Sequence, residues 1–187
     1  MEPTVGNKYA SRQREAILLA IGLLALGLCV GVFFSIPHTG GQMRSGESLQ
    51  FSLSDFWVIA GRNLRIGVQL LLGVLTFGLY SAAQLFSIGI NLGLTLETGT
   101  QAGVPVLKIV LLLLPHSIFE FAGFVVLGAL EFEAARLMYR KLRYDRLDEP
   151  SFVIRQFACQ SLIGFGFIFI GAIVETTLTV TITKHLL

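Results

Sequence analysis

Apolar residues form four long runs along the chain, separated by short polar connections. The runs cover residues 16–36, 64–96, 104–139 and 153–183. A helix needs about 20 mostly apolar residues to cross the ~30 Å hydrocarbon core of a bilayer, and every run meets that length. The pattern therefore predicts an all-α fold, a polytopic helical transmembrane bundle.

Two of these runs are longer than a single crossing requires. Run 64–96 could be tilted, or broken near the Gly89–Gly93 pair. Run 104–139 contains Pro115, which lacks a backbone N–H and disfavours the helix interior. The eleven residues before it would rise only about 16 Å as a helix, half a bilayer. We therefore predict a break of the third run at Pro115, and five membrane elements in all.

Glycines four residues apart occur in two of the runs. Gly27 and Gly31 form one GxxxG pair, and Gly89 and Gly93 form another. Such pairs let a second helix approach closely. They permit a homo-oligomer, and they equally suit packing within one chain.

The polar segments suggest a simple domain organisation. Residues 1–15 are predicted to be a cytoplasmic N-terminal segment, and 16–187 a single transmembrane domain. The connection 37–61 begins with turn-forming residues and ends in a short interfacial helix near Trp57. No clean signal-peptidase site follows the first run, so we read it as an uncleaved transmembrane helix.

Basic residues cluster in two places, near 8–14 and in 136–155, which includes the basic loop 140–152. Four simple spans would put these clusters on opposite sides of the membrane, against the positive-inside rule. Two topologies remove the conflict. The N-terminus could lie outside, or the chain could have five elements with both clusters inside and the C-terminus outside. We favour the second.

Composition supports a membrane location. Of 187 residues, 53% are hydrophobic and 14% are charged, whereas soluble domains average about 25% charged. We expect a multi-pass protein of the cell's inner, cytoplasmic membrane, with the lipid bilayer as its first partner. The net charge of +2 gives no case for nucleic-acid binding. Cys29 and Cys159 lie in apolar runs and are interpreted as small apolar fillers.

The segment 111–133 carries ionisable groups inside a hydrocarbon-like run. His116, Glu120 and Glu131 fall on one helical face, at spacings of four and eleven residues. Charges at bilayer depth cost roughly 3 kcal/mol, so such groups are functional candidates that face protein or water. The alternative is local capping, in which His116 and Glu120 stabilise a helix that starts after Pro115.

Other polar residues lie in neighbouring runs. Glu175 shares a face with small residues of the last run, and we infer that it faces Asn63, Asn91 or His116 across the bundle. Alternatively, it is one buried, protonated carboxyl that hydrogen-bonds between helices. Glu133 is expected to pair with Arg136 at the basic end of its helix.

An intramembrane metalloprotease is the enzyme hypothesis. It would need several metal ligands and a general base, but the chain has three histidines, and two of them lie near segment ends. There is no HExxH, GxSxG or Ser/Lys signature. We expect no enzyme activity, no metal and no cofactor.

Four features in sequence order resemble a known family. They are Asn63, the stretch INLGL at 90–94, PHSIFE at 115–120, and Glu175 in the last run. This pattern is similar to the stage II sporulation protein M family (SpoIIM, DUF95) over residues 60–180, although Ser117 stands where that family commonly has glycine. The resemblance implies a multi-span inner-membrane protein. The founding member of that family works with peptidoglycan hydrolases during engulfment in spore formers, and other members are encoded beside ATPase or bacteriocin-export genes.

Taken together, the sequence favours a non-enzymatic membrane scaffold or a transport- or export-associated protein. Its buried polar site would lie at a broken helix. The expected partners are other membrane or envelope proteins, such as a cell-wall hydrolase complex or the ATPase components of an exporter. The alternative is a proton- or ion-coupled permease, in which the ionisable stripe acts as a relay.

Overall fold

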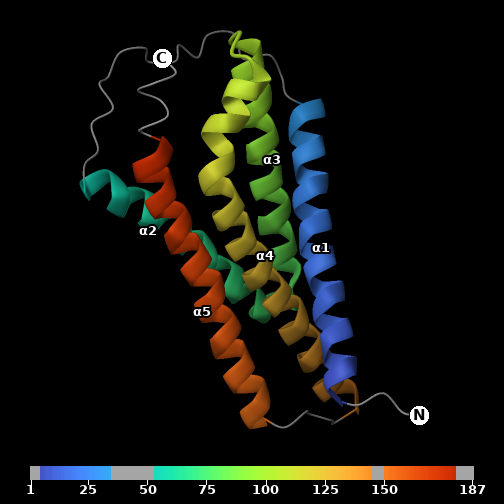
Figure 1. Ribbon diagram of the computed structural model, residues 1–187. Coiled ribbons are helices and arrows are strands. Elements are labelled where there is room, and N and C mark those ends of the chain that lie inside the picture. The colour runs from blue at the N-terminus through green and yellow to red at the C-terminus, as the bar shows by residue number, and fades with distance from the viewer. Residues whose placement is uncertain (1–4, 35–52, 145–149, 180–187) are drawn as a thin grey trace.

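A computed structural model of the chain describes residues 5–34, 53–144 and 150–179, and it contains five long helices (Figure 1). They are α1 (Val5–Phe33), α2 (Leu53–Leu71), α3 (Leu79–Gln101), α4 (Val106–Tyr144) and α5 (Pro150–Val174). A 3-10 segment, η1 (Leu72–Thr76), follows α2, and a π-helical turn, η2 (Glu175–Thr179), follows α5. All five long helices are long and apolar enough to cross a membrane. The predicted all-α transmembrane bundle is confirmed.

Successive helices run in alternating directions (Figure 1). The N-terminal end of α1 and the C-terminal end of α4 lie at the same end of the bundle, and α2 crosses obliquely behind α5. The last turn of α4 carries Lys141 and Arg143, while Arg12 and Arg14 lie near the start of α1. Both basic clusters therefore share one end, as the five-element topology requires.

The predicted break at Pro115 is wrong. Helix α4 runs without interruption from Val106 to Tyr144 and holds Pro115 in its interior. The proline ring fixes a φ that suits a helix, and its missing N–H removes one backbone hydrogen bond from a ladder of many. Proline is tolerated in transmembrane helices for this reason. The five membrane helices therefore arise elsewhere in the chain.

The fifth helix arises in the second apolar run, which folds into two helices, α2 and α3, rather than one. The chain turns at Phe77 and Gly78, whose φ angles of 52° and 82° are left-handed and cannot continue an α-helix. We expected a tilt, or a break near Gly89 and Gly93, which instead lie inside α3. The break was hidden because the segment 71–80 is almost entirely apolar and shows no polar turn signal.

Side-chain hydroxyls, rather than water, form hydrogen bonds with the backbone of this turn. The Thr76 hydroxyl donates to the Gly73 carbonyl (3.0 Å) and accepts from the Tyr80 N–H (3.0 Å), which caps the start of α3. Ser81 donates to the Leu70 carbonyl at the end of α2 (2.7 Å). These bonds satisfy backbone groups that lipid could not.

The start of α2 also differs from expectation. The interfacial helix predicted near Trp57 is the first part of α2, which continues through Asn63. Trp57 is exposed and its ring packs edge-on against Phe56 at 5.1 Å. Other expectations lie outside the described residues: the turn-rich start of the 37–61 connection, the middle of the basic loop 140–152, and the chain end at 180–187.

The two GxxxG pairs pack against each other within the chain. A Cβ on Gly27 would lie 2.1 Å from the Phe86 carbonyl oxygen, and one on Gly89 would lie 2.2 Å from that of Leu24. Gly31 and Gly93 show the same contacts one turn further on. Helices α1 and α3 therefore meet backbone to backbone, an approach open only to glycine.

Helices α4 and α5 form a second close pair. Cβ atoms added at Gly123 and Gly164 would lie 2.6 Å and 2.7 Å from atoms of the facing helix. Leu127 and Ile168 fill the adjoining space and have no exposed surface. These two helix pairs and α2 enclose the apolar core, and they set the positions of the buried polar groups.

Candidate functional site

A buried hydrogen bond joins α2 to α4 at the centre of the candidate site. The side-chain amide of Asn63 donates to the carboxylate of Glu120. Each residue is only 9% exposed. A buried carboxylate needs such a donor, because leaving it unpaired costs free energy comparable to a lost hydrogen bond or more. The sequence singled out both residues, and the structure brings them together.

Packing against α5 holds Glu120 in place. A Cβ added at Gly171 would lie 2.5 Å from the Glu120 Cγ and 3.3 Å from the His116 carbonyl oxygen. The missing side chain of Gly171 therefore makes the room that the stem of Glu120 occupies. This contact brings one turn of α4 directly against α5.

Glu175 lies one helical turn beyond Gly171, at the start of η2. It interacts electrostatically with Glu120, so the two carboxyls share one region between α4 and α5. Residues 175–179 form a π-helical turn, and the Thr176 hydroxyl bonds back to the carbonyls of Ala172 (2.9 Å) and Ile173 (3.1 Å). Single π-helical turns are rare and occur often at functional sites.

Arg62 is the member of this site that sequence reasoning missed. Its guanidinium interacts electrostatically with both Glu120 and Glu175, although its side chain is exposed on α2. We took the second run to begin after Asn63, which left Arg62 outside the membrane. The apolar residues of 56–60 were the available signal, because they extend the helix upstream of the arginine. We call Arg62, Asn63, Glu120 and Glu175 the polar cluster.

His116 is buried one turn before Glu120, with 8% of its surface exposed. The capping alternative does not apply to either residue, because α4 begins ten residues earlier, at Val106. His116 therefore sits in a helix interior, on the face that meets α5. Ser117 beside it is also buried.

Two predicted members of the site lie elsewhere. Asn91 is exposed on α3, where its amide donates to the Ser87 carbonyl one turn back (2.8 Å). Glu131 has no exposed surface, but it lies three turns from Glu120 and close to the Val74 backbone in η1. Within the described residues, neither of its carboxylate oxygens has a hydrogen-bond partner. The shared face predicted for α4 is real, but it meets different neighbours along its length.

The Glu133–Arg136 pair forms as predicted, at 3.6 Å. Arg136 also reaches Glu15 on α1, at 3.1 Å. This ion-pair group ties α1 to α4 at the basic end of the bundle and lies away from the polar cluster. Among the described residues, no three His, Cys, Asp or Glu side chains are arranged to hold a metal ion.

The fold and the polar cluster define a multi-pass helical membrane protein with ionisable groups at a three-helix contact. Comparison with protein families identifies it further. The family described as stage II sporulation protein M matches residues 18–180, and the chain belongs to that family. The resemblance carried by Asn63, the Pro115–Glu120 segment and Glu175 is thereby confirmed.

An archaeal relative covers nearly the same length. An uncharacterized protein of Methanocaldococcus jannaschii is 29% identical over 180 residues, which are 91% of this chain and 97% of that protein. No solved structure matches the chain. The relative's description adds no activity, so function is argued below from the geometry.

Proposed function

We propose that the protein is a non-enzymatic membrane scaffold, and that the outer face of α2 is its docking surface. The observation that carries this proposal is Arg65. It lies within the membrane-spanning part of α2, its side chain is exposed, and no described residue pairs with it. Arg62 is exposed on the same helix. An arginine facing lipid at bilayer depth costs roughly 3 kcal/mol even on lenient scales.

A partner protein would remove that cost. A transmembrane segment with a carboxylate at matching depth would pair with Arg65, which offers a planar, bidentate donor. The partners proposed are other membrane or envelope proteins, such as a cell-wall hydrolase complex or exporter components, and the membrane is the cytoplasmic one. The polar cluster supports this role, because Asn63 and Glu120 anchor the buried side of α2 while Arg65 is exposed on the same helix.

Co-purification with quantitative mass spectrometry tests the scaffold. Arg65→Gln should lower recovery of the partner at least tenfold while the protein still inserts into membranes. Arg155→Gln is the matched control, because Arg155 is likewise exposed, on α5. Glu120→Gln and Glu175→Gln are expected to weaken recovery more modestly, by altering the support of α2. Equal recovery by the wild type and Arg65→Gln would contradict the proposal.

A proton- or ion-coupled permease is the second candidate. It is supported by three ionisable groups, Arg62, Glu120 and Glu175, at one contact of α2, α4 and α5, and by the π-helical turn at Glu175. Proteoliposomes containing a pH-sensitive dye would show flux that Glu175→Gln abolishes. Wild-type flux no greater than that of empty liposomes would count against this function.

A further inference from the structure

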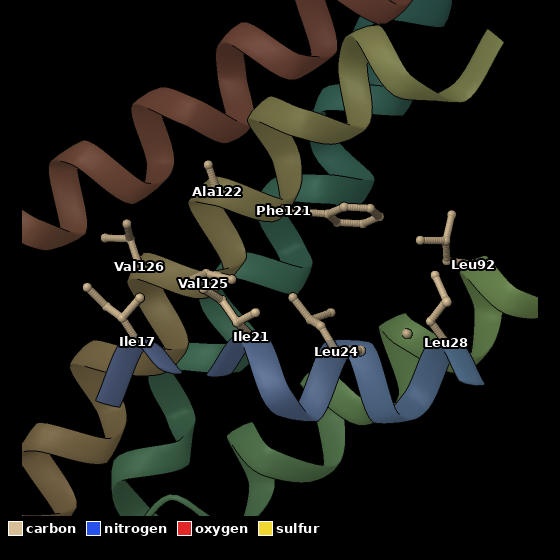
Figure 2. Close-up of a pocket in the computed structure, with 11 residues that line it drawn as sticks. Ile17, Ile21, Leu24, Leu28, Leu92, Phe121, Ala122, Val125 and Val126 are labelled. Carbon is tan, nitrogen blue, oxygen red and sulfur yellow. The ribbon is translucent and has the colours of Figure 1, made fainter. Parts of the chain in front are cut away.

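A hollow on the side of the bundle lies between α1, α3 and α4. Its volume is about 520 Å³, and its lining is apolar throughout. Figure 2 shows Ile17, Ile21, Leu24 and Leu28 pointing from α1 across the hollow, with Phe121 reaching in from α4. Gly89 and Leu92 of α3 complete its far end. We call this hollow the α1 groove.

The α1 groove lies alongside residues that span the membrane, so hydrocarbon is its natural filling. Its length follows α1 for twelve residues, from Ile17 to Leu28, a rise of about 16 Å. That rise equals half of a bilayer's hydrocarbon core. The groove is therefore matched in length and chemistry to one lipid chain of a single leaflet.

Arg14 lies beyond the Ile17 end of the groove. Arg14 precedes Ile17 by three residues, and the series 14, 17, 21, 24 and 28 follows one face of a helix. Arg14 is exposed, and no described residue forms an ion pair or hydrogen bond with it. It lies one turn beyond the groove, at the basic end of the bundle.

Nearby charges are otherwise engaged. Glu15 and Glu133 both pair with Arg136, and Arg12 interacts electrostatically with Glu133. Glu15 and Glu133 are thus already engaged by basic side chains. Arg14 remains available to an anion from the lipid headgroup layer, where phosphate is the abundant acceptor.

We propose that the α1 groove and Arg14 form a binding site for one anionic membrane phospholipid. One hydrocarbon chain lies in the groove, and the phosphate pairs with the Arg14 guanidinium at the basic end. The bound lipid completes the contact between α1 and α4 above the Glu15–Arg136 pair. The site is independent of the docking surface proposed on α2.

Native mass spectrometry in detergent tests the site, with phosphatidylglycerol as the anionic probe and phosphatidylcholine as the zwitterionic one. The wild type should bind one phosphatidylglycerol in preference to phosphatidylcholine. Arg14→Gln should weaken phosphatidylglycerol binding about fivefold, the effect of one basic group near an anionic surface. Arg143→Gln, which removes an exposed charge at the same end of the bundle, should leave the preference unchanged.

A variant that fills the α1 groove tests whether a hydrocarbon chain of the lipid binds there. Ala122 lines the groove, and Ala122→Leu should lower binding of both lipids. Ala83→Leu is the matched control, because Ala83 is exposed on α3 and does not line the groove. Unchanged lipid binding by Arg14→Gln, or by a folded Ala122→Leu, would overturn the proposal. So would a wild-type dimer that Ala122→Leu converts to a monomer, since a second copy would then fill the groove.

Photo-crosslinking needs no variant that risks misfolding. Phosphatidylglycerol with a diazirine on its chain should label wild-type peptides from 17–28 and 121–126 several-fold more than the exposed face of α5 around Leu162. Equal labelling of both regions would show ordinary contact with bulk lipid, and the proposal would fail.

Discussion

The side-chain amide of Asn63 donates a hydrogen bond to the carboxylate of Glu120, 57 residues away in sequence, and so links α2 to α4. Asn63→Ala should leave that buried carboxylate without its donor. We expect a loss of roughly 1 to 2 kcal/mol in the free energy of unfolding, measured by circular dichroism in a mixed-detergent titration. Asn91→Ala should change stability by less than about 0.5 kcal/mol, because the Asn91 amide is exposed and bonds only within α3. Equal effects from the two variants would show that the Asn63 bond contributes nothing.

Gly171→Ala should disturb the polar cluster through packing alone. The new Cβ would meet the Glu120 Cγ at 2.5 Å, so Glu120 or α5 must shift, at a cost of about 1 to 3 kcal/mol. Gly166→Ala, in the same helix with nothing within 4 Å, should be neutral or slightly stabilising. Thermal unfolding followed by fluorescence of Trp57 reports the change on α2. If Gly171→Ala were as stable as Gly166→Ala, the Glu120 side chain would not lie against Gly171.

The α1–α3 contact gives a second pair of matched glycines. In Gly27→Ala the added Cβ would overlap the Phe86 carbonyl at 2.1 Å, and backbone cannot yield as a flexible side chain does. We expect destabilisation by about 2 to 3 kcal/mol. Gly22→Ala has open space around it and should be tolerated. Denaturation in detergent measures the stability of both variants. A Gly27→Ala protein as stable as the wild type would indicate that α1 and α3 are further apart.

The arrangement of helices predicts a definite membrane topology. In a variant with Cys29 and Cys159 replaced by alanine, Gln13→Cys and Tyr144→Cys should react with an impermeant thiol reagent from the same side. Gly103→Cys, between α3 and α4, should react from the opposite side. By the positive-inside rule, the first two positions face the cytoplasm. Labelling of Gly103→Cys and Gln13→Cys from one side would instead fit four simple spans.

The sequence predicted the helical membrane class, the family and the Glu133–Arg136 ion pair. Hydrophobic run lengths follow from bilayer thickness, so the class needed no tertiary information. The GxxxG pairs were visible as patterns, although their partners were not. Of the predicted polar core, Asn63 and Glu120 meet directly and Glu175 joins them, whereas Asn91 faces outward on α3. The functional role of these residues stays a prediction.

The place where the second run breaks was not predictable from patterning. Pro115 is a strong local signal, yet a helix within a bundle tolerates one missing N–H. Phe77 and Gly78 give a weak local signal, and the turn there depends on Thr76 and on Ser81, whose hydroxyl reaches the end of α2. Arg62 was left out of the predicted site because the second run was predicted to begin after Asn63.

The amino-acid sequence therefore specified what the helices must do: cross a membrane, present glycines to a close neighbour, and carry several ionisable groups at membrane depth. These properties depend on residue type and spacing, which are local. Only the tertiary structure decided which glycines meet, where the extra helix arises, and that Gly171 makes room for Glu120 beside Asn63. Those outcomes depend on the register and crossing of helices distant in sequence, and a one-dimensional pattern does not contain them.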